Sequence, residues 1–179
     1  MKLLIAVLLS LFFTVGADDI DDIREYYNHV MNNLDNEFGL YRTEISINTE
    51  DGVYPALGNY QENITFYWGS EAGYSWLVLV IWSSEFSVHQ EYGEVLFSEP
   101  EEPWEGDTGE LVFEFVSYHN SDGILSESRW WYEGGELLRS SGQSDYPSGV
   151  IEFTPDIPGE YDYAHNPTEL LEMFNSIHY

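Results

Sequence analysis

The chain has 179 residues, of which 33 are acidic and 5 are basic, so its formal net charge at pH 7 is −28. This charge repels phosphate backbones and anionic lipid surfaces, and we expect no nucleic-acid partner. The chain has no cysteine, which excludes thiol catalysis, disulfide bonds and cysteine-ligated metals. Because 43% of the residues are hydrophobic and 17% are aromatic, we expect a folded domain rather than a disordered chain.

The first residues have the pattern of a cleaved secretory signal peptide. Lys2 precedes an apolar run that ends at Val15, and small residues lead up to Ala17. The run is too short for a good transmembrane helix, and no lipoprotein cysteine follows it. We therefore expect a signal peptide over residues 1–17, a single α+β domain over 18–179, and a secreted or periplasmic protein with no membrane span after cleavage.

Residues 19–35 are predicted to form an amphipathic helix. Aspartates crowd its start, where the helix dipole favours negative charge. Apolar side chains recur at steps of three and four residues, which places them on one face: Ile20, Ile23, Tyr27, Val30 and Leu34. Because the opposite face is polar, this helix is expected to lie on an apolar surface.

The middle of the chain is predicted to form strands. Alternating or β-branched segments separated by turn residues occur at 43–49, 63–68, 74–82, 95–98, 111–118, 127–132, 136–140 and 150–153. The segment 74–82 is apolar on both faces, which indicates a central strand covered on both sides. A buried helix could give the same run, but its β-branched and aromatic residues favour the strand.

The last element is predicted to be a helix with a capping box. Asn166 is the expected cap, Pro167 the first helical residue and Glu169 the returning side chain. The predicted fold is therefore α+β, with an antiparallel meander sheet of about seven strands and the N-terminal and C-terminal helices packed on it. We expect the helices to cover one face, and the long loops to cover part of the other.

A hairpin around Gly134 and Gly135 is the first candidate for a ligand site. A two-residue turn there places Trp131 opposite Leu138 and Trp130 opposite Arg139, so that Arg139 lies over Trp130 as a cation–π pair. Arg129 and Trp131 share the other face of the hairpin. The functional interpretation is a polar-aromatic ligand platform, and the structural interpretation is cross-strand packing with ion pairs.

The acidic stretch 94–110 and its Trp104 are the second candidate. Its carboxylates could bind calcium, but their spacing matches no EF-hand loop, and a solvated acidic loop is the alternative. An exposed Trp104 would suit sugar stacking or a protein partner, whereas a buried Trp104 would anchor the loop. With 33 acidic residues, any pair could be nominated for a glycosidase, and the five histidines show no zinc spacing. We assign no catalytic residue, no metal and no cofactor.

Two stretches resemble a group of uncharacterised exported bacterial proteins. The first is IREYYN at 23–28, and the second is ESRWWYEGGELLR at 127–139. The resemblance implies an N-terminal helix packed on an antiparallel sheet, and it implies no activity. Members of the group often have a lipoprotein anchor, whose cysteine this chain lacks.

These observations predict an exported, acidic, non-catalytic binding or protein-interaction domain. The candidate ligand-binding residues are Trp104, Arg129, Trp130, Trp131 and Arg139. The alternative is a secreted carbohydrate-binding or carbohydrate-active domain that uses exposed aromatic residues and carboxylates. The expected partner is accordingly a basic protein or a glycan.

Overall fold

The computed structural model of the chain describes residues 20–34, 39–49, 60–86, 89–105, 108–120, 125–146, 149–153 and 165–178. The predicted signal peptide at 1–17 lies outside these ranges. The described part contains the following elements in chain order: α2 (Ile20–Asn33), β1 (Tyr41–Thr49), β2 (Tyr60–Glu71), β3 (Tyr74–Phe86), β4 (His89–Phe97), the short 3₁₀ helix η1 (Pro103–Glu105), β5 (Leu111–Asn120), β6 (Leu125–Glu133), β7 (Glu136–Tyr146), β8 (Gly149–Phe153) and α3 (Pro167–His178).

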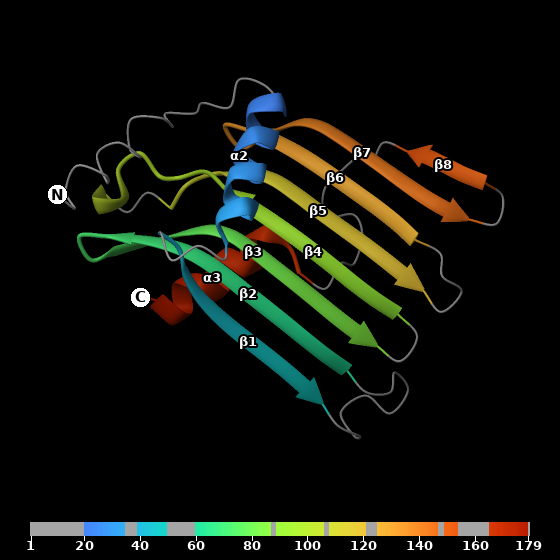
Figure 1. The fold of residues 1–179 in the computed structure, drawn as a ribbon, viewed down its shortest axis with the longest axis horizontal. Helices are drawn as coiled ribbons and strands as arrows, with labels where there is room; N and C mark the ends of the chain where they lie inside the picture. The colour runs from blue at the N-terminus through green and yellow to red at the C-terminus, as the bar shows by residue number, and fades with distance from the viewer. Residues whose placement is uncertain are drawn as a thin grey trace.

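The strands of the described residues form one antiparallel sheet in the order of the sequence, from β1 to β8. The predicted α+β meander with an N-terminal and a C-terminal helix is therefore confirmed, and the sheet has eight strands (Figure 1). Five of the seven connections between consecutive strands are two to four residues long, and strands joined by such short turns pair most easily with their immediate neighbours, which explains most of this order.

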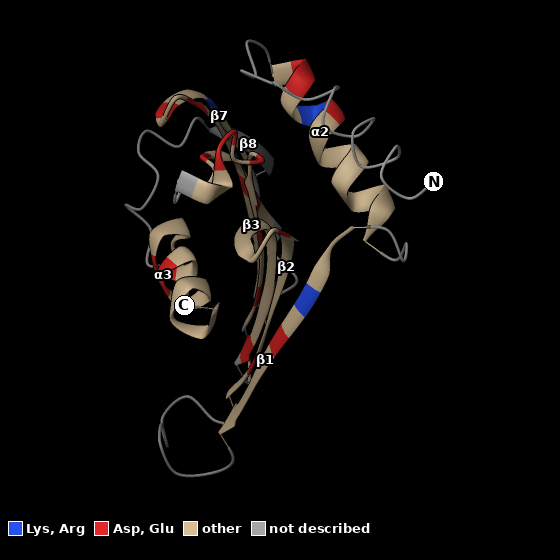
Figure 2. Cartoon of the chain, turned by 90° about the vertical axis from the view of Figure 1, so that its left-hand side faces the viewer, with Lys and Arg blue, Asp and Glu red and all other residues tan. Residues whose placement is uncertain are grey.

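The two helices lie on opposite faces of the sheet, so the expectation that both cover one face is wrong. Figure 2 shows the sheet nearly edge-on, with α2 on one side and α3 on the other. Ile23 and Val30 of α2 are buried in one hydrophobic cluster, and Leu170 and Phe174 of α3 are buried in the other. A sheet whose central strands are apolar on both faces requires a cover on each.

The central strand β3 contributes to both clusters, as the apolar run predicts. Leu77, Val80 and Trp82 lie on the α3 side, whereas Val78 and Leu79 lie on the α2 side. Val78 is an extra residue at a β-bulge, because Trp68 pairs with Leu77 while Tyr67 pairs with Leu79. A bulge places two consecutive side chains on one face, which strict alternation does not allow.

The predicted capping box of α3 is confirmed. The Asn166 side chain accepts a hydrogen bond of 2.9 Å from the Glu169 backbone N–H, and the Glu169 carboxylate accepts one of 3.4 Å from the Asn166 N–H. Just before the cap, the imidazole of His165 contacts the buried carboxylate of Glu62 of β2. This contact fixes the start of α3 to the sheet.

Candidate functional site

A pocket of about 380 Å³ lies between α2 and the sheet at strands β5, β6 and β7. The helix contributes one wall and the sheet the floor. The lining residues are Ile23, Arg24, Tyr27, Asn28, Phe113, Arg129, Trp131, Arg139 and Ser141. They belong mainly to the two stretches 23–28 and 127–139, which are about a hundred residues apart in sequence. We call this site the arginine pocket.

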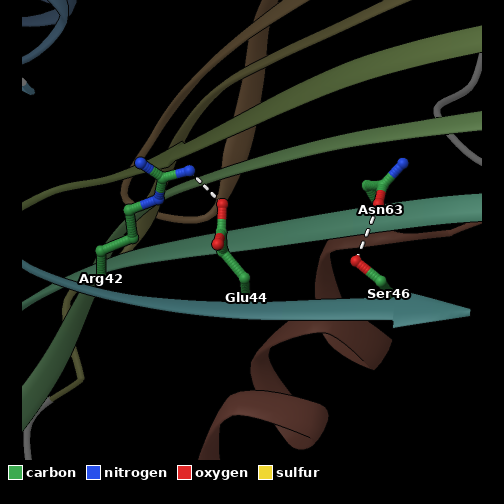
Figure 3. A network of polar contacts seen from close by, with 4 residues as sticks. All are labelled: Arg42, Glu44, Ser46 and Asn63. Carbon is green, nitrogen blue, oxygen red and sulfur yellow. Dashed lines mark hydrogen bonds and ion pairs between the residues drawn. The ribbon is translucent and has the colours of Figure 1, made fainter.

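The arginine pocket collects most of the chain's scarce arginines. The whole sequence has four arginines, and three of them, Arg24, Arg129 and Arg139, line this pocket. None of the nine lining residues is acidic, although the chain has 33 acidic residues. The fourth arginine, Arg42, lies on β1 and pairs with Glu44 (Figure 3). The pocket is therefore a local concentration of positive charge in a strongly acidic protein.

Each arginine of the pocket lies over an aromatic ring of the sheet. The guanidinium carbons of Arg24 and Arg139 are both 5.8 Å from the centre of the Trp131 ring system. That of Arg129 is 4.8 Å from the centre of the Phe115 ring. Cation–π contacts of this kind hold the guanidinium groups in place while their N–H donors remain able to bind an acceptor.

The three arginines differ in how their charge is balanced. Arg24 forms an ion pair of 2.9 Å with Asp21 on the exposed surface of α2, and Arg129 forms one of 2.8 Å with Glu127 on its own strand. Arg139 has no ion pair within the described part of the chain. Arg139 is therefore the cation of the pocket whose charge is least compensated.

The apolar wall of the pocket is a chain of three aromatic rings. Tyr27 meets Phe113 edge-on at a centroid distance of 5.3 Å and an interplanar angle of 63°. Phe113 meets Trp131 at 5.7 Å and 49°. Both Phe113 and Trp131 are buried, so the wall is fixed by packing against α2. Such contacts set the position of each ring more strictly than aliphatic packing would.

Two consecutive tyrosines fasten α2 above the pocket. The hydroxyl of Tyr26 donates to the backbone carbonyl of Phe97 at 3.1 Å, and that of Tyr27 donates to the buried carboxylate of Glu94 at 2.5 Å. Tyr92 donates to the other oxygen of Glu94. Burial and the hydrogen bond to Glu94 raise the pKa of Tyr27 above its ordinary value. Tyr27 therefore stays a neutral donor and holds the ring wall in place.

A β-bulge in the hairpin places Arg139 in the pocket. Gly134 and Gly135 form the predicted two-residue turn, with φ values of +55° and +77°, as a type I′ turn requires. The pairing then shifts, so that Arg139 lies opposite Trp131 and leaves Leu138 as the extra residue. The predicted contact of Arg139 with Trp130 is therefore wrong. The bulge moves Arg139 to the α2 face, where Trp131 and Arg129 lie.

The remaining predicted site residues lie elsewhere. Trp130 is fully buried on the α3 side of the sheet, where it packs in the core. Trp104 lies in η1 with 55% of its surface exposed, while Pro103 beside it is buried. The loop is thus not anchored by burial of Trp104, and this residue is not among those that line the arginine pocket.

Sequence reasoning missed Arg24, Tyr27 and Asn28 as pocket residues, although it noted the stretch that contains them. The rarity of arginine could have indicated Arg24. Nothing local predicts that 23–28 and 127–139 meet, because their contact depends on the helix crossing strands that are distant in sequence.

Two buried carboxylates lie on the α3 side, away from the pocket. Burial raises the pKa of Glu114 to about 7, against the opposing effect of a 3.1 Å hydrogen bond from the Tyr132 hydroxyl. For Glu62, burial also favours the neutral acid, but hydrogen bonds from His165 and Tyr60 and the charge of His165 outweigh it and lower the pKa. Glu62 contacts His165 just before α3, and Glu114 contacts Tyr132 of β6, so neither carboxylate lines the arginine pocket.

A second hollow of about 450 Å³ lies on the α2 face of the sheet, over strands β2 to β5. Two rows of cross-strand partners line it with polar side chains, namely Asn63, Ser83, Tyr92 and Ser117 in one row and Gln61, Glu85, Gln90 and His119 in the other. At its edge, Ser46 of β1 donates to the Asn63 side chain at 2.8 Å (Figure 3). This hollow contains amides, hydroxyls and carboxylates but no arginine.

Within the described ranges, no group of three or more histidine, aspartate or glutamate side chains is arranged to hold a metal ion. The described helices include none that is both long and apolar enough to cross a membrane. The comparisons of this chain with protein-family models, with curated proteins and with solved structures found no match.

Proposed function

We propose that this protein is an exported, non-catalytic binding domain that holds a negatively charged group of its ligand in the arginine pocket. One observation supports this proposal above all others. Three of the four arginines of the chain line one pocket, and no acidic residue lines it. Arg24 and Arg129 are paired with Asp21 and Glu127, but Arg139 has no ion pair within the described residues, so the pocket keeps an unbalanced positive charge that favours an anion from outside the chain.

The chemistry of the lining supports binding rather than catalysis. Guanidinium groups stay protonated at all physiological pH values and cannot act as general bases. The nine lining residues include no histidine and no carboxylate, which are the usual proton-transfer groups. Asn28 and Ser141 supply neutral hydrogen-bonding groups that can orient a ligand.

The test is a thermal-shift screen of small anions against neutral analogues, with ionic strength matched by sodium chloride. Matching is essential because any salt screens the repulsion between carboxylates. A ligand at a hundred times its Kd stabilises the folded state by about 2.7 kcal/mol. We expect at least one anion to raise the melting temperature of the wild type and of Arg42→Gln, but not of Arg139→Gln. Equal stabilisation of all three proteins would refute the proposal.

Export is part of the proposal and has its own test. The pattern at 1–17 predicts that this segment is absent from secreted material. Intact-mass measurement of protein collected from the medium or periplasm decides this. A mass that includes Met1 to Ala17 would contradict it.

A second candidate function is binding of a glycan, and the polar hollow over β2 to β5 favours it. Its amides, hydroxyls and carboxylates can form the paired hydrogen bonds that vicinal sugar hydroxyls require, and Tyr92 adds an aromatic ring. A glycan array with the wild type and with Gln61→Ala and Asn63→Ala separates the two candidates. Loss of a glycan signal in these variants, with no effect of Arg139→Gln, would favour the hollow over the arginine pocket.

A further inference from the structure

We propose that the ligand of the arginine pocket is a small aromatic monocarboxylate, meaning a single ring that carries one carboxylate group directly or through a methylene group. This inference rests on the proposed function, because it assigns the chemical class of the ligand to the same pocket. It follows from three features of the pocket, which are its charge balance, its ring wall and its size.

The charge balance points to a single negative charge. Arg24 and Arg129 are paired with Asp21 and Glu127, at 2.9 and 2.8 Å, whereas Arg139 has no ion pair in the described part of the chain. A ligand with one negative charge balances Arg139 without breaking either existing pair. A dianion would leave one charge uncompensated, and the net charge of −28 would repel it further.

The arrangement of the guanidinium groups favours a planar anion. Arg24 and Arg139 both lie 5.8 Å from the centre of Trp131, so two like charges share one ring system. Both guanidinium groups line the same pocket, so an anion bound there is attracted to each of them. A carboxylate is flat and accepts parallel N–H bonds from a guanidinium fork, which matches arginine better than a lysine-type point charge would.

The ring wall and the pocket volume indicate the chemistry of the uncharged part of the ligand. Tyr27, Phe113 and Trp131 form a continuous chain of rings beside the pocket. Phe113 and Trp131 are 8% and 5% exposed, so the half-buried Tyr27 presents most of the aromatic surface. An aromatic ring packs on such a wall edge-to-face or offset, with a gain beyond simple burial. The volume of about 380 Å³ is near the lower end of ligand pockets, which suits one ring rather than a long chain.

The experiment measures binding by isothermal titration at matched ionic strength, with four probes that each remove one feature. Phenylacetate has both ring and charge, benzyl alcohol lacks the charge, acetate lacks the ring, and inorganic phosphate has more charge and no ring. Each probe is tested on the wild type, Arg139→Gln, Arg24→Gln and the control Arg42→Gln. Arg42 is exposed on β1 and lies outside the pocket, so Arg42→Gln removes the same charge without touching the site.

We expect phenylacetate to bind the wild type more tightly than the other three probes. Arg139→Gln should weaken its affinity about 10- to 100-fold, as for loss of a charged hydrogen bond. Arg24→Gln should weaken it by a smaller factor, because Asp21 already shares that charge, and Arg42→Gln should change it less than about twofold. Thermal melts of each variant establish that it is folded, and Arg24→Gln provides a second test if Arg139→Gln does not fold.

The outcomes separate the two proposals. Tighter binding of phosphate or acetate than of phenylacetate, with loss in Arg139→Gln, would overturn the aromatic monocarboxylate and leave the anion pocket standing. Absence of binding by every anion would overturn both. A peptide that ends in phenylalanine presents the same chemistry, so Gly-Phe is titrated as well. Tighter binding of Gly-Phe than of phenylacetate would overturn the assignment to a free small acid.

Discussion

Replacing the buried carboxyl of Glu114 by an amide should make the protein less sensitive to pH. Glu114 is 5% exposed on the α3 face of the sheet, and burial raises its pKa from 4.5 to about 7. The folded state therefore keeps the proton over a range in which the unfolded chain has released it. The contribution of Glu114 to the free energy of unfolding is fully present below the unfolded pKa of 4.5. It is lost as the pH rises from about 4.5 towards 7.

The size of this effect follows from the pKa difference. Each pKa unit corresponds to about 1.4 kcal/mol, so ionisation of Glu114 costs the folded state about 3 kcal/mol at pH 8. Glu114→Gln retains an oxygen that can accept the hydrogen bond from Tyr132 and removes the charge. We expect its free energy of unfolding, relative to the wild type, to rise by up to about 3 kcal/mol between pH 5 and pH 8.

Urea titrations of the wild type and the variant at pH 5 and pH 8 measure this difference. Any cost of the amide that does not depend on pH cancels in the comparison. Glu136→Gln is the matched control, because it removes one negative charge from an exposed position of the hairpin. An equal difference between Glu114→Gln and the wild type at both pH values would refute the reasoning.

Three further predictions concern packing, the turn and the charge. Gly93→Ala should destabilise the fold by about 1–3 kcal/mol in urea titrations, because the added Cβ would lie 2.3 Å from ring atoms of the buried Trp82; a neutral result would mean that this ring can move. Gly135→Val should cost about 1–2 kcal/mol through its positive φ alone, since no atom lies within 4 Å of the new Cβ, and a melting temperature equal to that of the wild type would contradict the turn conformation. Raising sodium chloride from 0.01 to 1 M shortens the screening length from about 30 to about 3 Å, so the melting temperature near pH 7 should rise, and a flat response would show that repulsion among the carboxylates is small.

The local elements could be read from the sequence because their signals lie within a few residues. The three- and four-residue spacing from Ile20 to Leu34 matches α2, and the Asn166–Glu169 pair marks the start of α3. The two glycines at 134 and 135 determine a hairpin turn, since both require positive φ. In each case the physical cause is a periodicity or a backbone conformation that a short stretch of chain sets by itself.

Only the tertiary structure decided which side chains lie on which face of the sheet. Bulges leave Val78, Val112 and Leu138 without a direct partner, and each shifts the alternation of its strand by one residue. The bulge at Leu138 moves Arg139 from the side of Trp130 to the side of Trp131. Strict alternation from the turn predicts the wrong face, because the energy of a bulge depends on packing on both sides of the sheet.

The arginine pocket itself exists only in the folded chain. The sequence determines that arginine is rare, that acid is abundant and that two motifs contain most of the cations. It does not determine that α2 lies across β5 to β7, since that contact depends on Tyr26 and Tyr27 reaching β4 through hydrogen bonds about seventy residues away in sequence. Long-range packing of this kind minimises exposed apolar surface over the whole sheet, so no single stretch of residues specifies it.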